Sequence, residues 1–130
     1  MDNAVINWIK SSNYDIATAS AILKAKRYVY VIFFCHLSIE KLLKGSVCKI
    51  THKLPPKTHD LFLLLKLANL NLPENHELLI AHLNTASIPT RYPEDMSKIS
   101  KQYNRSVAQR YLKAAKDFLK WLKQNQNLQY

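Results

Sequence analysis

The stretch YVYVIFFCHLSIEKLLKGSVCKI, residues 28–50, decides the fold of this 130-residue chain. Its first residues, YVYVIFF, are aromatic or β-branched and locally favour a strand. The continuation HLSIEKLLKGSVCK extends the pattern to a length that suits a long helix instead. The most apolar part, residues 28–37, is about half as long as a membrane span. We therefore expect a buried core helix.

Further helical segments flank this stretch, marked by the spacing of their apolar residues and by residues that begin or end helices. Asp2 or Asn3 can cap the first of them. The segment KLPPK, residues 53–57, ends the central helix because proline cannot continue a helix. Pro73 is favoured in the first turn of the helix that it opens. The expected helices cover residues 3–26, 28–50, 58–70, 73–86, and from 98 or 101 to 123.

Two segments near the C-terminus are expected to be irregular. SIPTRYPED, residues 87–95, holds two prolines four positions apart and predicts a loop of about ten residues. The polar tail, residues 124–130, is expected to fray. Short connections between long amphipathic helices favour antiparallel neighbours. The sequence thus predicts an all-α fold, an up-and-down four-helix bundle with a short additional helix, as one domain over residues 1–130 with a core of about 3–123.

The composition argues against several classes of protein. Gly45 is the one glycine, so the glycine-rich phosphate loops and the dinucleotide fingerprint are absent. An all-β fold is disfavoured as well, because its hairpins use glycine for positive φ angles. Lys and Arg number 19 against 9 Asp and Glu, which gives a formal charge of +10. Such a charge suits a polyanion or an acidic protein as partner, and it also suits a basic surface that is merely solvated.

The cysteines and histidines predict neither a disulfide nor a metal site. Cys35 and Cys48 lie in apolar or helical sequence, and the N-terminus MDNAVINWIK shows no signal peptide, so we expect free thiols, the cytoplasm and no membrane association. Cys48 and His52 are spaced i, i+4, with His59 further on. No fourth ligand stands at a spacing familiar from zinc sites. We expect no metal and no cofactor.

Two pairs of polar residues are candidates for chemistry. His36 and Glu40 are spaced i, i+4, so they share a helix face and can hydrogen-bond. They form either a buried pair that orients the helix or an active-site pair. His59 and Asp60 follow Thr58 at the start of the third helix. There the carboxylate either tunes the imidazole or caps the helix and faces its dipole.

Basic residues near the C-terminus offer two further candidates. Arg91 lies between Pro89 and Pro93, and its guanidinium suits a phosphate or a carboxylate, unless it only ties the loop to a helix end. The last helix carries an apolar arc and an opposite basic arc. The basic arc either binds a polyanion or is a solvated face. It comprises Lys98, Arg105, Lys113, Lys116, Lys120 and Lys123.

Several short motifs, taken in order, resemble the HEPN domain, the small helical partner of minimal nucleotidyltransferases. They are Tyr14-Asp15 with Ala17, Glu40-Lys41-x-x-Lys44, Pro56-x-Thr58-His59-Asp60-Leu61 and Arg91-Tyr92-Pro93. The resemblance covers about residues 3–123. It implies a four-helix bundle with a short extra helix, a homodimer, and a cytoplasmic protein paired with a nucleotidyltransferase, often as toxin and antitoxin.

Many HEPN domains are metal-independent ribonucleases, and their signature is an arginine followed four to six residues later by a histidine. This sequence departs from that signature, because no histidine follows Arg91, Arg105 or Arg110. Without that imidazole, activation of the 2′-hydroxyl and protonation of the leaving group lack their usual agent.

The resemblance therefore implies an accessory subunit that binds nucleotide or RNA phosphate. Its binding residues would be Arg91, Tyr92, Lys44 and Glu40. One alternative is a metal-independent ribonuclease toxin that uses Arg91 with His59 or His36 as the base. A second alternative is a non-catalytic protein-interaction module.

Overall fold

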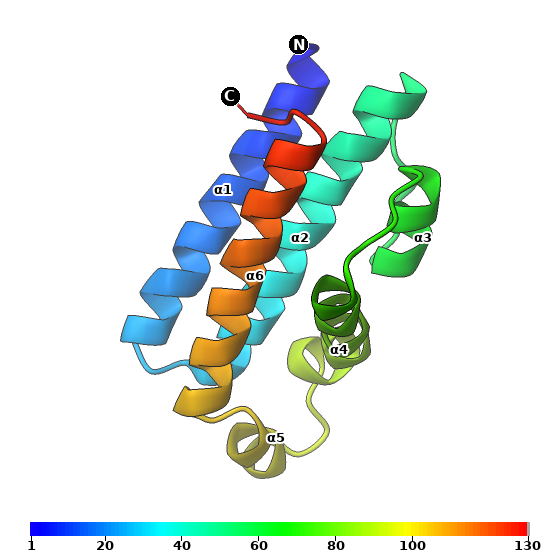
Figure 1. Cartoon of the computed structure of the whole chain (residues 1–130). Helices are drawn as coiled ribbons and strands as arrows, with labels where there is room; N and C mark the ends of the chain where they lie inside the picture. The colour runs from blue at the N-terminus through cyan, green and yellow to red at the C-terminus, as the bar shows by residue number, and fades with distance from the viewer. Residues whose placement is uncertain (130) are drawn as a thin grey trace.

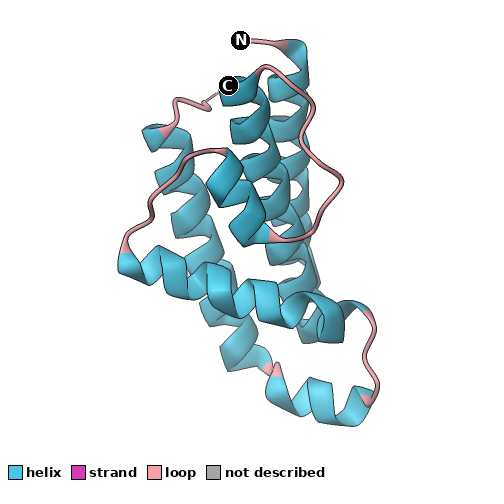
Figure 2. Ribbon diagram, turned by 90° about the vertical axis from the view of Figure 1, so that its right-hand side faces the viewer, coloured by secondary structure: helices cyan, strands magenta, loops and turns pink. Residues whose placement is uncertain are grey.

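The computed structural model describes residues 1–129, in which all regular elements are helices, as expected. Three long helices, α1, α2 and α6, lie side by side along one direction (Figure 1). Helix α4 runs across that direction (Figure 2), and the short helices α3 and α5 flank it in the chain. The helices are α1 (Asn3–Lys24), α2 (Tyr28–Thr51), α3 (Leu61–Leu67), α4 (Glu74–Arg91), α5 (Met96–Gln102) and α6 (Arg105–Asn125).

Helix α2 is the centre of the fold and contacts all five other helices. Its strand-like beginning is helical because Val31, Ile32 and Cys35 are fully buried among other helices. Burying each large aliphatic side chain stabilises the fold by about 1.5–3 kcal/mol. That gain outweighs the small local preference of β-branched residues for a strand.

Helices α1 and α2 form the most extensive contact in the fold. Asp2 caps α1 by accepting a hydrogen bond from the Ala4 amide, as the sequence predicts. The Ser12 hydroxyl donates to the Ser38 carbonyl at 2.7 Å, and the Ser38 hydroxyl donates to the Ser12 carbonyl at 2.8 Å. These small side chains let the two backbones come close.

The last turn of α4 corrects the expected loop over residues 87–95. Helix α4 continues through Pro89 to Arg91, so only residues 92–95 separate it from α5. A proline has a φ angle that fits a helix, and its costs are the missing N–H and the crowding of its ring against the preceding turn. The Thr90 hydroxyl donates to the Ala86 carbonyl at 2.7 Å, and the Tyr92 amide donates to the Ile88 carbonyl at 2.8 Å. This extension places Arg91 at a helix end rather than in a loop.

The expected last helix, from 98 or 101 to 123, is interrupted at residues 103–104. Helix α5 ends at Gln102, and Asn104 starts α6 by accepting a hydrogen bond from the Val107 amide at 3.0 Å. Tyr103 is buried and packs edge-on against Tyr111. An N-cap and a buried aromatic together favour the break over a continuous helix.

The end of the chain differs from the expected frayed tail over the residues that the structure describes. Helix α6 reaches Asn125, and Leu128 is fully buried. The Lys49 ammonium donates to the carbonyls of Gln126 and Asn127 at 2.8 and 2.9 Å. A single apolar side chain and a cation at a helix end thus hold a polar segment. Residue 130, also part of the expected tail, lies outside the described residues.

Candidate functional site

Helix α2 carries three of the candidate residues at successive turns, His36, Glu40 and Lys44, and all three are buried. Glu40 is 3% exposed and accepts a hydrogen bond from the Lys44 ammonium at 3.0 Å. The His36 Nδ1 atom lies 3.9 Å from Glu40 Oε1, which is too long for a hydrogen bond. The His36–Glu40 pair therefore shares a face, as predicted, without the hydrogen bond that its spacing allows.

The Oε1 atom of Glu40, which Lys44 leaves free, contacts His59, a residue 19 positions further along the chain. His59 Nδ1 lies 2.7 Å from Glu40 Oε1. His59 is held there because Asp60 caps α3, accepting from the amides of Phe62 and Leu63, while the Thr58 hydroxyl accepts from the Asp60 amide. The capping alternative for Asp60 is confirmed, although Asp60 is the cap itself rather than a first-turn residue.

Arg91, the last residue of α4, closes this chain of contacts. Its Nη1 atom lies 3.0 Å from His59 Nε2, and its guanidinium lies 4.9 Å from the centre of the Phe33 ring. A guanidinium only donates hydrogen bonds, so His59 Nε2 accepts. The hydrogen on Nδ1 then points to Glu40. Arg91, His59 and Glu40 thus form a directed relay from the surface to the core.

His36 lies beside this relay and is neutral at physiological pH. Burial lowers the pKa of His36 from 6.5 to about 4, with Glu40 opposing the shift and Arg91 adding to it. The side chain is 1% exposed, and neither ring nitrogen has a hydrogen-bond partner. An unpartnered imidazole at this depth adds hydrogen-bonding capacity to the site but no charge.

The site carries a net positive charge. Glu40 is flanked by the Lys44 ammonium, which also lies 5.8 Å from the centre of the Trp8 ring. Within residues 1–129, no carboxylate lies within ion-pair distance of Arg91. One carboxylate therefore balances one of two cations. The excess charge sits on Arg91, at the outer end of the relay.

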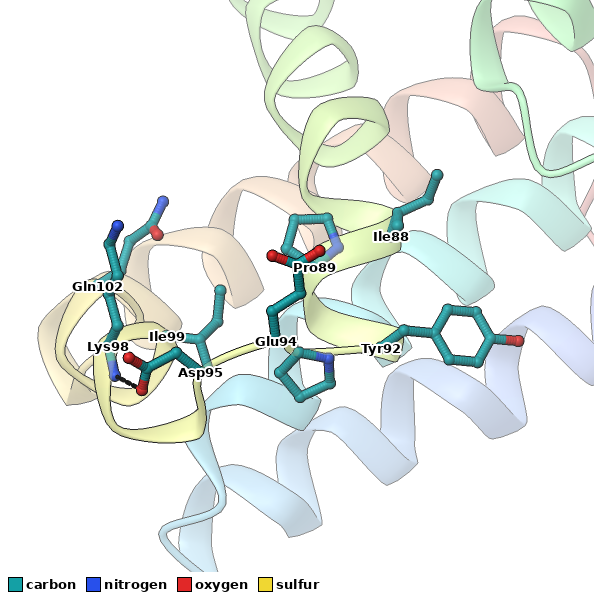
Figure 3. A pocket seen from close by; sticks show the side chains of 9 residues that line it. Ile88, Pro89, Tyr92, Glu94, Asp95, Lys98, Ile99 and Gln102 are labelled. Carbon is teal, nitrogen blue, oxygen red and sulfur yellow. Dashed lines mark hydrogen bonds between the residues drawn. The ribbon is translucent and has the colours of Figure 1, made fainter.

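Tyr92 does not join this cluster. It is 70% exposed and lines a cavity of about 480 Å³ between the end of α4 and α5. In Figure 3 its ring points away from Lys98 and Gln102 on α5. Among residues 1–129, no hydrogen bond or ring contact joins the Tyr92 side chain to Arg91, His59 or Glu40.

Sequence reasoning missed several members of the site and of its surroundings. The Arg91 guanidinium lies over Phe33, and Trp8 lies beside Lys44, whereas both aromatic residues look like ordinary core residues in the sequence. Asp15 binds Lys41 at 2.7 Å and ties α1 to α2 next to the site. The sequence signal for Asp15 and Lys41 was only their place in the short motifs that resemble the HEPN domain.

The cysteines and histidines considered for a metal site are placed as follows. Cys35 and Cys48 are free and buried, and burial raises the pKa of the Cys35 thiol to about 12. His52 ends α2 with a left-handed φ of 58° and is exposed. Among residues 1–129, no three His, Cys, Asp or Glu side chains are grouped so that they could hold a metal ion.

Comparison with known proteins places the chain in a family. A model of the HEPN domain matches residues 5–125. The chain belongs to the HEPN domain family. No curated protein sequence shows a significant match to it. No helix within residues 1–129 is long and apolar enough to cross a membrane.

Two crystal structures share the HEPN fold of this chain. TT1696 from Thermus thermophilus is 23% identical, with a TM-score of 0.79, over 95% of this chain and 98% of that one. ST0689, described as an archaeal HEPN homologue, is 22% identical, with a TM-score of 0.75, over 96% of this chain and 99% of that one. At these identities the likeness concerns the fold alone.

Proposed function

We propose that the relay of Arg91, His59 and Glu40 binds a phosphate group of a nucleotide or of RNA. The observation that carries the proposal is an arginine that has no carboxylate partner among residues 1–129 and is held in place by a ring face and by an imidazole. A planar guanidinium offers two parallel donors to a phosphate. Stacking on Phe33 restricts the orientations of the guanidinium, which lowers the entropy lost on binding.

An arriving phosphate competes with His59 for the Arg91 donors. Once Arg91 turns to the phosphate, His59 Nε2 is released from its hydrogen bond to Arg91. Glu40, at 2.7 Å from the other ring nitrogen, still holds the ring in place. Lys44 is buried and engaged with Glu40, so it supports the carboxylate instead of touching the ligand.

The proposal is tested by calorimetric titration of the protein with AMP and with adenosine. Wild-type protein should bind AMP and not adenosine. Arg91→Gln should weaken AMP binding by about 1–3 kcal/mol, because a charge-assisted hydrogen bond is lost. Arg27→Gln, which removes the same charge from an exposed position before α2, is the matched control. Equal affinities for AMP and adenosine, or equal losses in both variants, would contradict the proposal.

Metal-independent RNA cleavage is a second candidate, and the Glu40–His59 contact favours it. A carboxylate that fixes one imidazole nitrogen leaves the other as a general base. Here that nitrogen accepts from Arg91 at 3.0 Å, so cleavage requires Arg91 to move to the phosphate first. His36 is too deeply buried to reach a 2′-hydroxyl.

Cleavage is tested by incubating the protein with single-stranded RNA and a chelator. The accessory-subunit proposal expects little or no product, because the arginine-to-histidine spacing of the ribonucleases is missing. Product that disappears in both Arg91→Gln and His59→Gln, but not in His82→Gln, would establish the ribonuclease instead. His82 is an exposed histidine on α4 outside the relay.

Family resemblance also supports a set of partners for this binding subunit. The protein would be a cytoplasmic homodimer that works with a nucleotidyltransferase, in some cases as one half of a toxin–antitoxin pair. Ile88, Tyr92 and Leu54 are exposed apolar side chains that a partner could cover. Co-purification of such a complex without any phosphate binding would favour the non-catalytic interaction module.

A further inference from the structure

A row of lysines runs along α6, apart from the relay. Lys113, Lys116, Lys120 and Lys123 follow one another at three- and four-residue spacings, which keeps them on one side of the helix over about 15 Å. Among residues 1–129, the first three make no ion pair or hydrogen bond. Such an uncompensated row of like charges repels itself, so it costs stability in the free protein.

These four lysines line a shallow groove in the surface of the protein. Two adjoining hollows of about 280 Å³ each lie along α6 where it faces α1, and Lys116 lines both. Helices α1 and α6 lie side by side over this length (Figure 1). The floor is apolar, with Ile16 and Leu119 in one hollow and Leu23 and Leu112 in the other. We call this feature, with its four lysines, the α1–α6 furrow.

We propose that the α1–α6 furrow binds the phosphodiester backbone of a nucleic acid duplex. Lysine ammonium groups are compact point charges that suit phosphates in a row. Among residues 1–129, no aromatic side chain lines the hollows, so this part of the chain offers no stacking platform of the kind that single strands use. Of the described lining residues, Asp117 alone carries a carboxylate.

Two further observations agree with an anionic ligand in this furrow. The Lys123 ammonium donates to the Asn13 side chain on α1, and no carboxylate of residues 1–129 lies within ion-pair distance of it. Burial lowers the pKa of Lys123, so its charge is costly where it stands. A phosphate beside it would offset this cost. The furrow shares no residue with the relay, so this proposal goes beyond the function proposed above and does not depend on it.

The test measures duplex binding by fluorescence anisotropy over a series of salt concentrations. Four phosphate contacts to a duplex predict a slope of about −3.6 in the plot of log affinity against log salt. The variant Lys116→Gln/Lys120→Gln should flatten the slope by about 2. The matched control is Lys53→Gln/Lys66→Gln, which removes the same charge from exposed positions outside both sites. An RNA duplex and a DNA duplex of the same sequence are compared, and the one that binds more tightly shows which nucleic acid the furrow prefers.

Several outcomes would overturn the proposal. They are the absence of duplex binding, equal slopes in the furrow variant and the control, and a slope that changes in Arg91→Gln but not in the furrow variant. Binding of polyglutamate as tight as that of the duplex, and lost in the same variant, would assign the furrow to an acidic protein instead. AMP binding in the furrow variant should match wild type. AMP binding thus tests the phosphate site at Arg91, and duplex binding tests the furrow, so either proposal can fail without the other.

Discussion

Removal of the buried charge of Glu40 tests the interior of the site. Glu40→Gln keeps the shape of the side chain but leaves the Lys44 ammonium, 3.0 Å away and buried, without its counterion. Breaking a buried ion pair at one partner costs about 3–5 kcal/mol. Folding free energies are about 5–15 kcal/mol, so the loss is a large fraction of the total. For a domain of this size, we expect the melting temperature to fall by about 11–18 °C.

A second substitution separates the charge effect from lost packing. If the uncompensated ammonium causes the loss, adding Lys44→Met to Glu40→Gln should recover at least about 1 kcal/mol, because apolar side chains of similar volume replace buried ion pairs at little cost. Urea unfolding, followed by far-UV circular dichroism at neutral pH, measures each free energy. Glu77→Gln, at an exposed position on α4, is the control and should change it by less than about 0.5 kcal/mol. A Glu40→Gln protein as stable as this control would refute the reasoning.

Three further predictions concern titration, the chain end and assembly. The folded-state pKa of His36 lies at about 4, below its unfolded value of 6.5. Stability should therefore fall by about 3 kcal/mol as the pH drops from 6.5 to 4, and a His36→Phe protein should lack this dependence in pH-dependent unfolding. Leu128→Ala should cost about 2–3 kcal/mol in urea unfolding, whereas a frayed tail predicts no change. Light scattering should find a dimer at tens of micromolar, with an interface of at least roughly 1,000 Å².

Most of the fold could be predicted from the helical periodicity of apolar residues and from the residues that cap helices. The Asp2 cap and the break at residues 53–57 lie where local sequence rules put them, whereas the third helix begins at Leu61, after Asp60, rather than at Thr58. Other errors fell where tertiary contacts decide. Pro89 stays within the last turns of α4, although proline lacks an N–H and its ring crowds the preceding turn, and residues 126–129 are held because Leu128 reaches the core. Neither effect has a local signature in the sequence.

The candidate site was predicted residue by residue, but not as a cluster. His36 and Glu40 were visible because their spacing is helical and local. The contact from Glu40 to His59, and that from His59 to Arg91, join segments 19 and 32 residues apart. The first depends on how the segment before α3 packs against α2, and the second on the end of α4 reaching that segment. Tyr92 was predicted because it follows Arg91 in the sequence; its exposed side chain lines the cavity between α4 and α5, and its part in binding stays a prediction.

The most direct test of the phosphate site follows the Arg91 Nε–H and the His59 ring signals by nuclear magnetic resonance during titration with AMP, and with adenosine as the control. A phosphate that takes over the Arg91 donors should shift both signals, saturably and with one dissociation constant, while adenosine should shift neither. AMP that shifts resonances elsewhere on the protein and leaves Arg91 and His59 unchanged would contradict the account.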